Sequence, residues 1–128
     1  MTVPNVISIV DDDDAFRDSM RRLLRSHGYA VAAFASATEF LASAQLSATE
    51  CLVADVHMPA MTGPELCGHL RESGHVIPTI LVTADPQEDV RDRALGLGIG
   101  CYLSKPVDEA VLIGCLRAAL VGRHDDRG

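Results

Sequence analysis

Five side chains that could bind a cation and a phosphoryl group lie within two residues of the ends of short apolar runs, although the runs are far apart in the sequence. Asp11 and Asp12 follow the first run, and Asp55, Thr83 and Lys105 follow three later ones. Three carboxylates brought together repel one another, so such a cluster requires either a shared proton or a cation. Hard oxygen ligands favour Mg²⁺, with Mn²⁺ as the second choice. We expect Asp12 and Asp55 as direct ligands and Asp11 as a water-mediated one.

The same side chains suit the capture of a phosphoryl group on a carboxylate. A carboxylate can form an acyl phosphate when a metal ion and a fixed ammonium neutralise the charge on the transferring oxygens. Asp55 fits the acceptor and Lys105 fits the ammonium. The Thr83 hydroxyl could donate a hydrogen bond to the new group, and that bond exists only in the modified state. The sequence therefore predicts Thr83 as a sensor of the modification.

The order of apolar segments predicts the scaffold that would gather these residues. Five runs of strand length alternate with segments of helical period, which indicates a parallel α/β sheet with right-handed crossovers. We expect one flavodoxin-like, doubly wound, five-stranded sheet in the order 2-1-3-4-5 with five helices, binding its ligand at the carboxyl ends of the strands. The expected strands are Val6–Val10, Tyr29–Phe34, Cys51–Ala54, Ile77–Val82 and Cys101–Leu103.

Capping and turn residues indicate where the helices begin and end. Side-chain oxygens before a helix satisfy its first amides, and glycine suits the left-handed residue after its end. The first helix should have an Asp cap before Phe16 and end at Gly28, and the second should follow a Ser36–Glu39 capping box and reach Ala44. The third should start around Pro64, and the fourth should start at Asp85–Pro86 and lose its regularity at Gly96, Gly98 and Gly100. The last helix should run from about Val107 to Val121.

Composition limits the classes of partner and compartment. The net charge is −7 and no stripe of Lys and Arg appears, so we expect no direct nucleic-acid binding and no membrane association. No basic segment followed by a long apolar stretch signals export. The four cysteines are separated by 16, 34 and 14 positions, a spacing without a CxxC pair or a zinc rhythm. We interpret Cys51, Cys67, Cys101 and Cys115 as free buried thiols in a reducing cytoplasm.

From Val6 to about Val121 the chain resembles the response-regulator receiver domain of two-component signalling. The resemblance lies in residues 7–13, 53–66, 80–84 and 102–106, which occur in the family's order and separations. It is of the chemotaxis-regulator type and nearest the nitrogen-fixation regulators. Residues 36–41 are similar to regulators that carry a helix-turn-helix output domain. The expected division is a receiver domain over 1–121 and a flexible polar tail over 122–128.

The resemblance implies roles for individual residues and a signalling function. It implies Asp11 and Asp12 as the acidic pair, Asp55 as phosphoacceptor, and Thr83 and Lys105 as phosphoryl contacts. It further implies the His57 backbone carbonyl as a metal ligand, a cis peptide before Pro106, and Tyr102 as an aromatic switch. The phosphodonor would be a histidine kinase or a phosphotransfer protein. The chain would then be a cytoplasmic signalling domain that promotes its own phosphorylation and dephosphorylation, rather than an enzyme.

Two surfaces and two rival functions complete the sequence-based expectations. The last helix has an apolar set too wide for one buried stripe, which favours a partner or phosphorylation-dependent homodimer on the face of helix four, strand five and helix five. Arg17, Arg21, Arg22 and Arg25 could dock an acidic kinase surface. One rival is a small Mg²⁺-dependent phosphohydrolase of the haloacid-dehalogenase type, although its DxDxT signature is missing. The other is a phosphorylation-independent interaction module.

Overall fold

The five expected strands form one parallel sheet. The computed structural model describes residues 6–97 and 99–125 of the chain. The sheet has the order β2-β1-β3-β4-β5, as predicted, and every pairing is parallel. Its strands are β1 Val6–Val10, β2 Ala30–Phe34, β3 Thr49–Asp55, β4 Thr79–Thr83 and β5 Cys101–Ser104.

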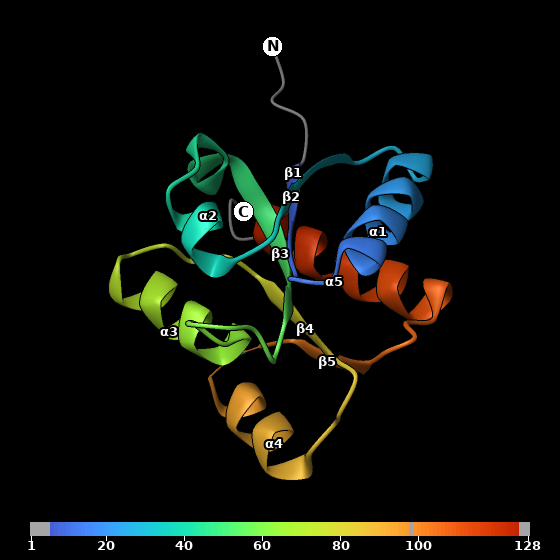
Figure 1. Ribbon diagram of the computed structural model, residues 1–128. Helices are drawn as coiled ribbons and strands as arrows, with labels where there is room; N and C mark the ends of the chain where they lie inside the picture. Colours follow the sequence, from blue (N-terminus) through green and yellow to red (C-terminus); the bar gives the residue numbers. More distant parts are fainter. Residues whose placement is uncertain (1–5, 98, 126–128) are drawn as a thin grey trace.

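Helices cover both faces of the sheet (Figure 1). One apolar cluster fills the space between the sheet and α1 and α5, and a second fills the space under α2, α3 and α4. The core is mostly aliphatic, and Phe40 is its one fully buried aromatic side chain within the part of the chain that is described. The helical elements are α1 Asp14–Ser26, α2 Ala37–Leu41, the 3₁₀ helix η1 Ala44–Ala48, α3 Gly63–Glu72, α4 Glu88–Gly96 and α5 Glu109–Asp125.

Local sequence chemistry explains the ends of α1. The Asp13 side chain accepts hydrogen bonds from the Ala15 and Phe16 amides, so it supplies the predicted aspartate cap. At the other end, Gly28 has φ +90°, a left-handed conformation that glycine adopts without a steric penalty. The helix therefore begins directly beside Asp11 and Asp12, and its first turn faces the carboxyl edge of the sheet.

Three of the predicted helix boundaries were wrong. The helix expected to reach Ala44 ends at Leu41, because Ser43 caps a separate 3₁₀ turn through the Gln45 amide. The predicted Ser36–Glu39 capping box retains one bond among those described, from the Glu39 amide to Ser36 Oγ. The last helix begins at Glu109 rather than Val107 and continues to Asp125, past the expected end at Val121. The remainder of the expected tail, residues 126–128, lies outside the described residues.

The fourth helix also begins later than predicted. It starts at Glu88 with Gln87 as its cap residue, and Asp85 makes no capping bond. Two hydrogen bonds hold the preceding segment, which bends at Ala84 and Asp85: the Asp85 amide donates to Thr83 Oγ1, and the Gln87 amide donates to the Tyr102 hydroxyl. The helix ends at Gly96, and Gly98 of the predicted glycine-rich stretch lies outside the described residues.

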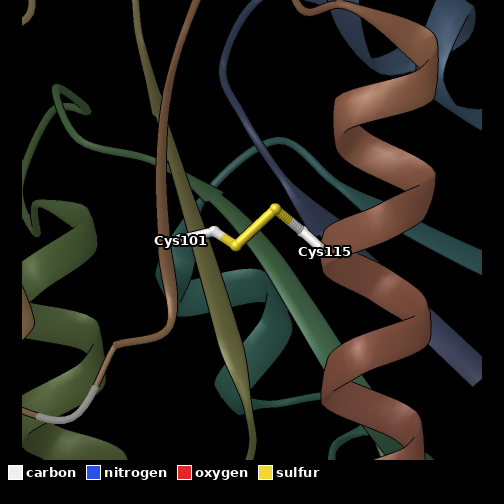
Figure 2. The surroundings of a disulfide bond; sticks show 2 residues. All are labelled: Cys101 and Cys115. Carbon is white, nitrogen blue, oxygen red and sulfur yellow. A yellow bond between two sulfur atoms is a disulfide. The ribbon is translucent and has the colours of Figure 1, made fainter.

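The interpretation of all four cysteines as free thiols was also wrong. Cys101 at the start of β5 and Cys115 within α5 form a disulfide, with their Cα atoms 6.5 Å apart (Figure 2). The separation of 14 positions gave no sign of the pairing, since it arises only when α5 packs back along the edge strand. Cys51 and Cys67 keep their thiols and are buried. Over the described residues, no helix combines the length and the hydropathy that crossing a membrane requires.

Candidate functional site

Strand register brings the predicted site residues to one edge of the sheet. Val10 lies opposite Ala54, so the next residues along the two strands, Asp11 and Asp55, are neighbours. Thr83 lies opposite Ser104, and the Lys105 amide donates to the Thr83 carbonyl at 2.8 Å. Parallel strands all end at the same edge, which is why residues so distant in sequence meet there.

The three predicted carboxylates form a compact cluster. One oxygen from each of Asp11, Asp12 and Asp55 lies within 4.8 Å of the others. Asp11 is fully buried, Asp55 is nearly so, and Asp12 is exposed. The cluster therefore has two carboxylates in the protein and one that faces solvent, an arrangement that leaves one side of the site open.

Both side-chain oxygens of Asp11 already accept hydrogen bonds. Oδ1 accepts from the Asp13 amide at 2.9 Å, and Oδ2 accepts from Lys105 Nζ at 2.8 Å. The Asp11 backbone carbonyl accepts a further bond from Arg17 Nη1 at 2.7 Å. Charge-assisted bonds of this kind compensate the burial of a carboxylate. Asp11 is thus held in one orientation by residues on both sides of it.

The Asp55 carboxyl is in a different electrostatic situation. Its pKa is raised from the ordinary 3.8 to about 6, chiefly by burial and next by the neighbouring Asp11 carboxylate. The Lys105 ammonium, 3.8 Å from Asp55 Oδ1, acts in the opposite direction. The net rise in pKa shows that one ammonium does not offset burial and the crowded negative charge together. A cation at this point would favour the ionised, nucleophilic form of Asp55.

Lys105 is fixed by three groups from three elements. Its Nζ atom bonds Asp11, lies near Asp55, and stands 4.2 Å from the centroid of the Phe16 ring on α1. The aromatic face attracts a cation, and the contact also shields one side of the ammonium from water. The peptide bond between Lys105 and Pro106 is cis, as the family resemblance implied.

Thr83 and Tyr102 are linked by a short connecting segment at the same edge. Thr83 is fully buried at the end of β4, and its Oγ1 accepts the Asp85 amide at 3.0 Å. Two residues further on, the Gln87 amide donates to the Tyr102 hydroxyl at 3.3 Å. Tyr102 is half-buried against the cluster under α4. The hydroxyl groups of the two predicted switch residues therefore accept hydrogen bonds from the two ends of the same short segment, residues 85–87.

His57 is placed at the mouth of the site, two residues beyond Asp55. Its side chain is exposed, and it lies close enough that its charge lowers the pKa of Asp55. The predicted role of its backbone carbonyl as a metal ligand stays a prediction.

Several residues that support the site escaped the sequence analysis. Phe16 fits the buried stripe of α1, so the pattern gave no sign of its contact with Lys105. Arg17 was expected to dock an acidic kinase surface with the other arginines, but its guanidinium reaches the Asp11 carbonyl and also pairs with Asp14. Arg21 and Arg22 both pair with Asp18 on their own helix, so the α1 surface is less basic than expected.

A capping box near Asp55 was also missed. Thr62 and Glu65 exchange side-chain and backbone hydrogen bonds at the start of α3. The threonine-x-x-glutamate spacing is visible in the sequence and could have predicted it. The capping box holds the start of α3 close to the residues that follow β3, where the Gly63 amide donates a hydrogen bond to the Val56 carbonyl.

Comparison with known proteins identifies the family. The sequence profile of the response regulator receiver domain matches residues 7–117. The chain belongs to this family. Response regulator protein TodT of Pseudomonas putida is 38% identical over 116 residues, which cover 91% of this chain and 51% of TodT. Transcriptional regulatory protein FixJ of Azorhizobium caulinodans is 37% identical over 122 residues, which cover 95% of this chain and 57% of FixJ.

Solved structures agree with this assignment of the receiver domain. Chemotaxis protein CheY4 of Vibrio cholerae matches with a TM-score of 0.83 at 27% identity, over 92% of this chain and all of CheY4. The receiver domain spans about half the length of the curated relatives given above. It is a signalling domain of the response-regulator type, and its acidic cluster occupies the carboxyl edge of a sheet with the predicted strand order.

Proposed function

We propose that this receiver domain accepts a phosphoryl group onto Asp55 from a histidine kinase or a phosphotransfer protein, in a reaction that depends on Mg²⁺. The observation that carries the proposal is the meeting of three carboxylates with one ammonium, Lys105 Nζ being 2.8 Å from Asp11 and 3.8 Å from Asp55. A carboxylate that must approach a phosphate requires this compensation of charge.

The residues present fit a divalent cation. Three carboxylates against one ammonium leave two uncompensated negative charges at the cluster, and all the ligand atoms are hard oxygens. Since both Asp11 oxygens are already hydrogen-bonded, Asp12 and Asp55 are the better direct ligands, with Asp11 acting through water. The His57 carbonyl is the proposed third protein ligand. Mg²⁺ or Mn²⁺ would supply positive charge to the transferring phosphoryl oxygens.

Asp55 and Lys105 have different roles in the proposed phosphoryl transfer. An Asp55 oxygen attacks phosphorus, a P–O bond forms, and the P–N bond to the donor imidazole breaks, so that the departing imidazole takes a proton from solvent. Lys105, fixed by Asp11 and Phe16, stabilises the charge on the phosphoryl oxygens. Water entering through the open side would later hydrolyse the acyl phosphate, so the domain would promote both its phosphorylation and its dephosphorylation.

The loop between Thr83 and Tyr102 offers a path for the signal. If the Thr83 hydroxyl moved toward a phosphoryl group on Asp55, it would lose the hydrogen bond that it now accepts from the Asp85 amide. The segment that follows carries the Gln87 amide, which now holds the Tyr102 hydroxyl. Loss of that bond would let Tyr102 turn inward, as proposed for its switch role.

The face made by α4, β5 and α5 is the proposed output surface. Four large apolar side chains on α4, after its end, and on α5 are 39–57% exposed: Leu95, Leu97, Val111 and Val121. An exposed apolar group of this kind suits a phosphorylation-dependent partner or a second copy of the chain. We propose residues 1–121 as the receiver unit and the cytoplasm as its compartment, with no direct contact to nucleic acid or membrane.

The experiment that tests the proposal is incubation with acetyl phosphate and Mg²⁺, followed by intact-mass measurement. The wild type should gain one phosphoryl group. Asp55→Asn should gain none, because an amide is not a nucleophile toward phosphorus. Removal of Mg²⁺ with a chelator should abolish the gain in the wild type.

Asp92→Asn is a matched control, because Asp92 is an exposed carboxylate on α4 and its loss changes the net charge equally. This variant should be phosphorylated like the wild type. Absence of phosphoryl transfer to the wild type would favour an interaction module. Sustained turnover of unrelated phosphate esters would favour a phosphohydrolase, and either result would overturn the proposal.

A further inference from the structure

The disulfide joins two elements whose relation is central to the proposed output. Cys101 is the first residue of β5, the edge strand, and Cys115 is near the middle of α5 (Figure 2). Side chains alternate along a strand, so Cys101 and Leu103 face α5 while Tyr102 faces the α4 side. The bond therefore fixes the α5 side of β5 and leaves the Tyr102 side of the strand unlinked.

The link also encloses part of the functional site. The disulfide closes the chain from Cys101 to Cys115 into a covalent loop, and Lys105 is one of the residues of that loop. Cross-linking a segment of this length removes conformational freedom from the chain between its ends. The disulfide thus restricts the segment that carries the ammonium toward Asp11 and Asp55.

The bond differs from the other cysteines in its accessibility. Both sulfur-bearing residues are half-buried, and both line a cavity of about 230 Å³ whose other lining residues are Pro78, Thr79, Ile80, Gly100, Ala118 and Ala119. A small thiol can approach the two sulfur atoms through this cavity. By contrast, Cys51 is fully buried and Cys67 is 5% exposed. Burial also raises the pKa of the Cys67 thiol, which makes it less reactive.

We infer that Cys101 and Cys115 form a reversible thiol–disulfide site whose oxidised form clamps β5 to α5 and holds Lys105 in the acidic cluster. The regulatory part of this inference rests on the proposed function. A disulfide in a domain that acts in a reducing compartment is typically transient and redox-sensing rather than permanent.

The chemistry requires a low-molecular-weight thiol and its disulfide as co-reactants. In reduction, a thiolate attacks one protein sulfur, the Cys101–Cys115 bond breaks, and a mixed disulfide forms while the released protein thiolate takes a proton. A second thiolate then displaces the remaining protein sulfur, which gives two protein thiols and one small-molecule disulfide. Oxidation is the reverse sequence, and two electrons pass in each direction.

The first test titrates the native protein with glutathione and its disulfide, using alkylation and peptide mass analysis to report each cysteine. Cys101 and Cys115 should change together and reversibly, while Cys51 and Cys67 stay protected until the protein is unfolded. A pair that is reduced only after unfolding, or that never oxidises in the folded chain, would overturn the inference.

The second test compares the mobility of the clamped and open forms by hydrogen exchange. Amides of β5 and the first half of α5 should exchange about tenfold faster after reduction, and the thermal midpoint should fall by roughly 5–10 °C. The double variant Cys101→Ser, Cys115→Ser should behave like the reduced wild type under both redox conditions. Equal exchange in the oxidised and reduced wild type would contradict the clamp without reliance on any variant.

The third test connects the clamp to the phosphorylation site. With acetyl phosphate and Mg²⁺, the oxidised wild type should be phosphorylated at least twofold faster than the reduced form, because Lys105 is already in position. The double serine variant should show one rate under both conditions. Equal wild-type rates would overturn the regulatory inference. If neither form is phosphorylated, the proposed function fails, and the alkylation and exchange results still decide the clamp.

Discussion

The central strands and the edge strand β5 hold their parts of the site in different ways. β1, β3 and β4 are buried at every residue but one. β1 leads directly into Asp11, and β3 and β4 end at Asp55 and Thr83. β5 pairs with one neighbour, its residues are half-buried or exposed, and it precedes Lys105. The carboxylates are thus fixed by close packing on both faces, as expected of a parallel sheet.

The β5 edge strand and the residues that follow it are held by a few separate contacts instead. A hydrogen bond to Asp11, a ring contact with Phe16 and a disulfide fix the segment that carries Lys105. Discrete contacts can be made and broken singly, whereas a packed core responds as a unit. The centre of the sheet therefore holds the proposed metal and acceptor residues rigidly, and the β5 edge is the part of the molecule suited to change.

The largest expected effect comes from truncating equivalent leucines in the two regions. Leu52 on β3 is fully buried, and Leu103 on β5 is half-buried. Leu52→Ala should lower the free energy of unfolding by about 2–5 kcal/mol, because it leaves a cavity that the sheet cannot close. Leu103→Ala should cost less than half as much, since solvent already reaches that side chain. Urea unfolding under reducing conditions measures both, and similar losses would break the comparison.

The next effect concerns the charge that the rigid centre must accommodate. The folded-state pKa of Asp55, about 6, exceeds its ordinary value of 3.8, so the folded protein binds the proton more tightly than the unfolded chain. The resulting stabilisation is complete below about pH 4 and is lost as the pH rises through 6. In metal-free buffer above pH 6, Asp55→Asn should therefore be more stable than the wild type by on the order of 2–3 kcal/mol.

Unfolding measured from pH 4 to pH 8 checks this expectation. The difference between Asp55→Asn and the wild type should grow with pH through this window and then level off. Added Mg²⁺ should reduce it, because the cation stabilises only the ionised carboxylate. A difference that is independent of pH would show that burial of Asp55 does not control its protonation.

The centre of the molecule was also the part that the sequence made easiest to predict. Strand order and the meeting of Asp11, Asp55, Thr83 and Lys105 follow from strict alternation of elements and from residues placed at strand ends. These features depend on periodicity and register, which a single sequence carries. The predicted Mg²⁺ and the roles of His57 and Tyr102 are still proposals, because they concern states with a bound ion or phosphoryl group.

The edge was harder to predict because its contacts depend on side-chain placement in three dimensions. The Cys101–Cys115 bond joins residues with no characteristic spacing, and Phe16 is one apolar residue among several on α1. The start of α4 was misplaced for the same reason: the Thr83 and Tyr102 hydroxyls occupy amides that local capping would otherwise have used. Local propensity gives way where tertiary hydrogen bonds compete with it.

The smallest expected effect concerns the close contact between the start of α3 and β3, the strand that ends at Asp55. A Cβ atom placed on Gly63 would lie 2.5 Å from the Asp55 carbonyl oxygen and 2.9 Å from Leu81 Cδ2. The backbone cannot yield as a flexible side chain would, so Gly63→Ala should cost about 1–3 kcal/mol and displace Asp55. Gly68→Ala on the same helix is the matched control, because no atom lies within 4 Å of its added Cβ.

The control should be neutral or stabilising by up to about 1 kcal/mol, since alanine favours the helix over glycine. Urea unfolding gives the two stabilities, and acetyl phosphate labelling reports whether Asp55 has moved. Gly63→Ala should slow the labelling, whereas Gly68→Ala should not. If both variants are equally stable and equally labelled, the acceptor strand tolerates displacement, and rigidity would no longer distinguish the centre of the sheet from its β5 edge.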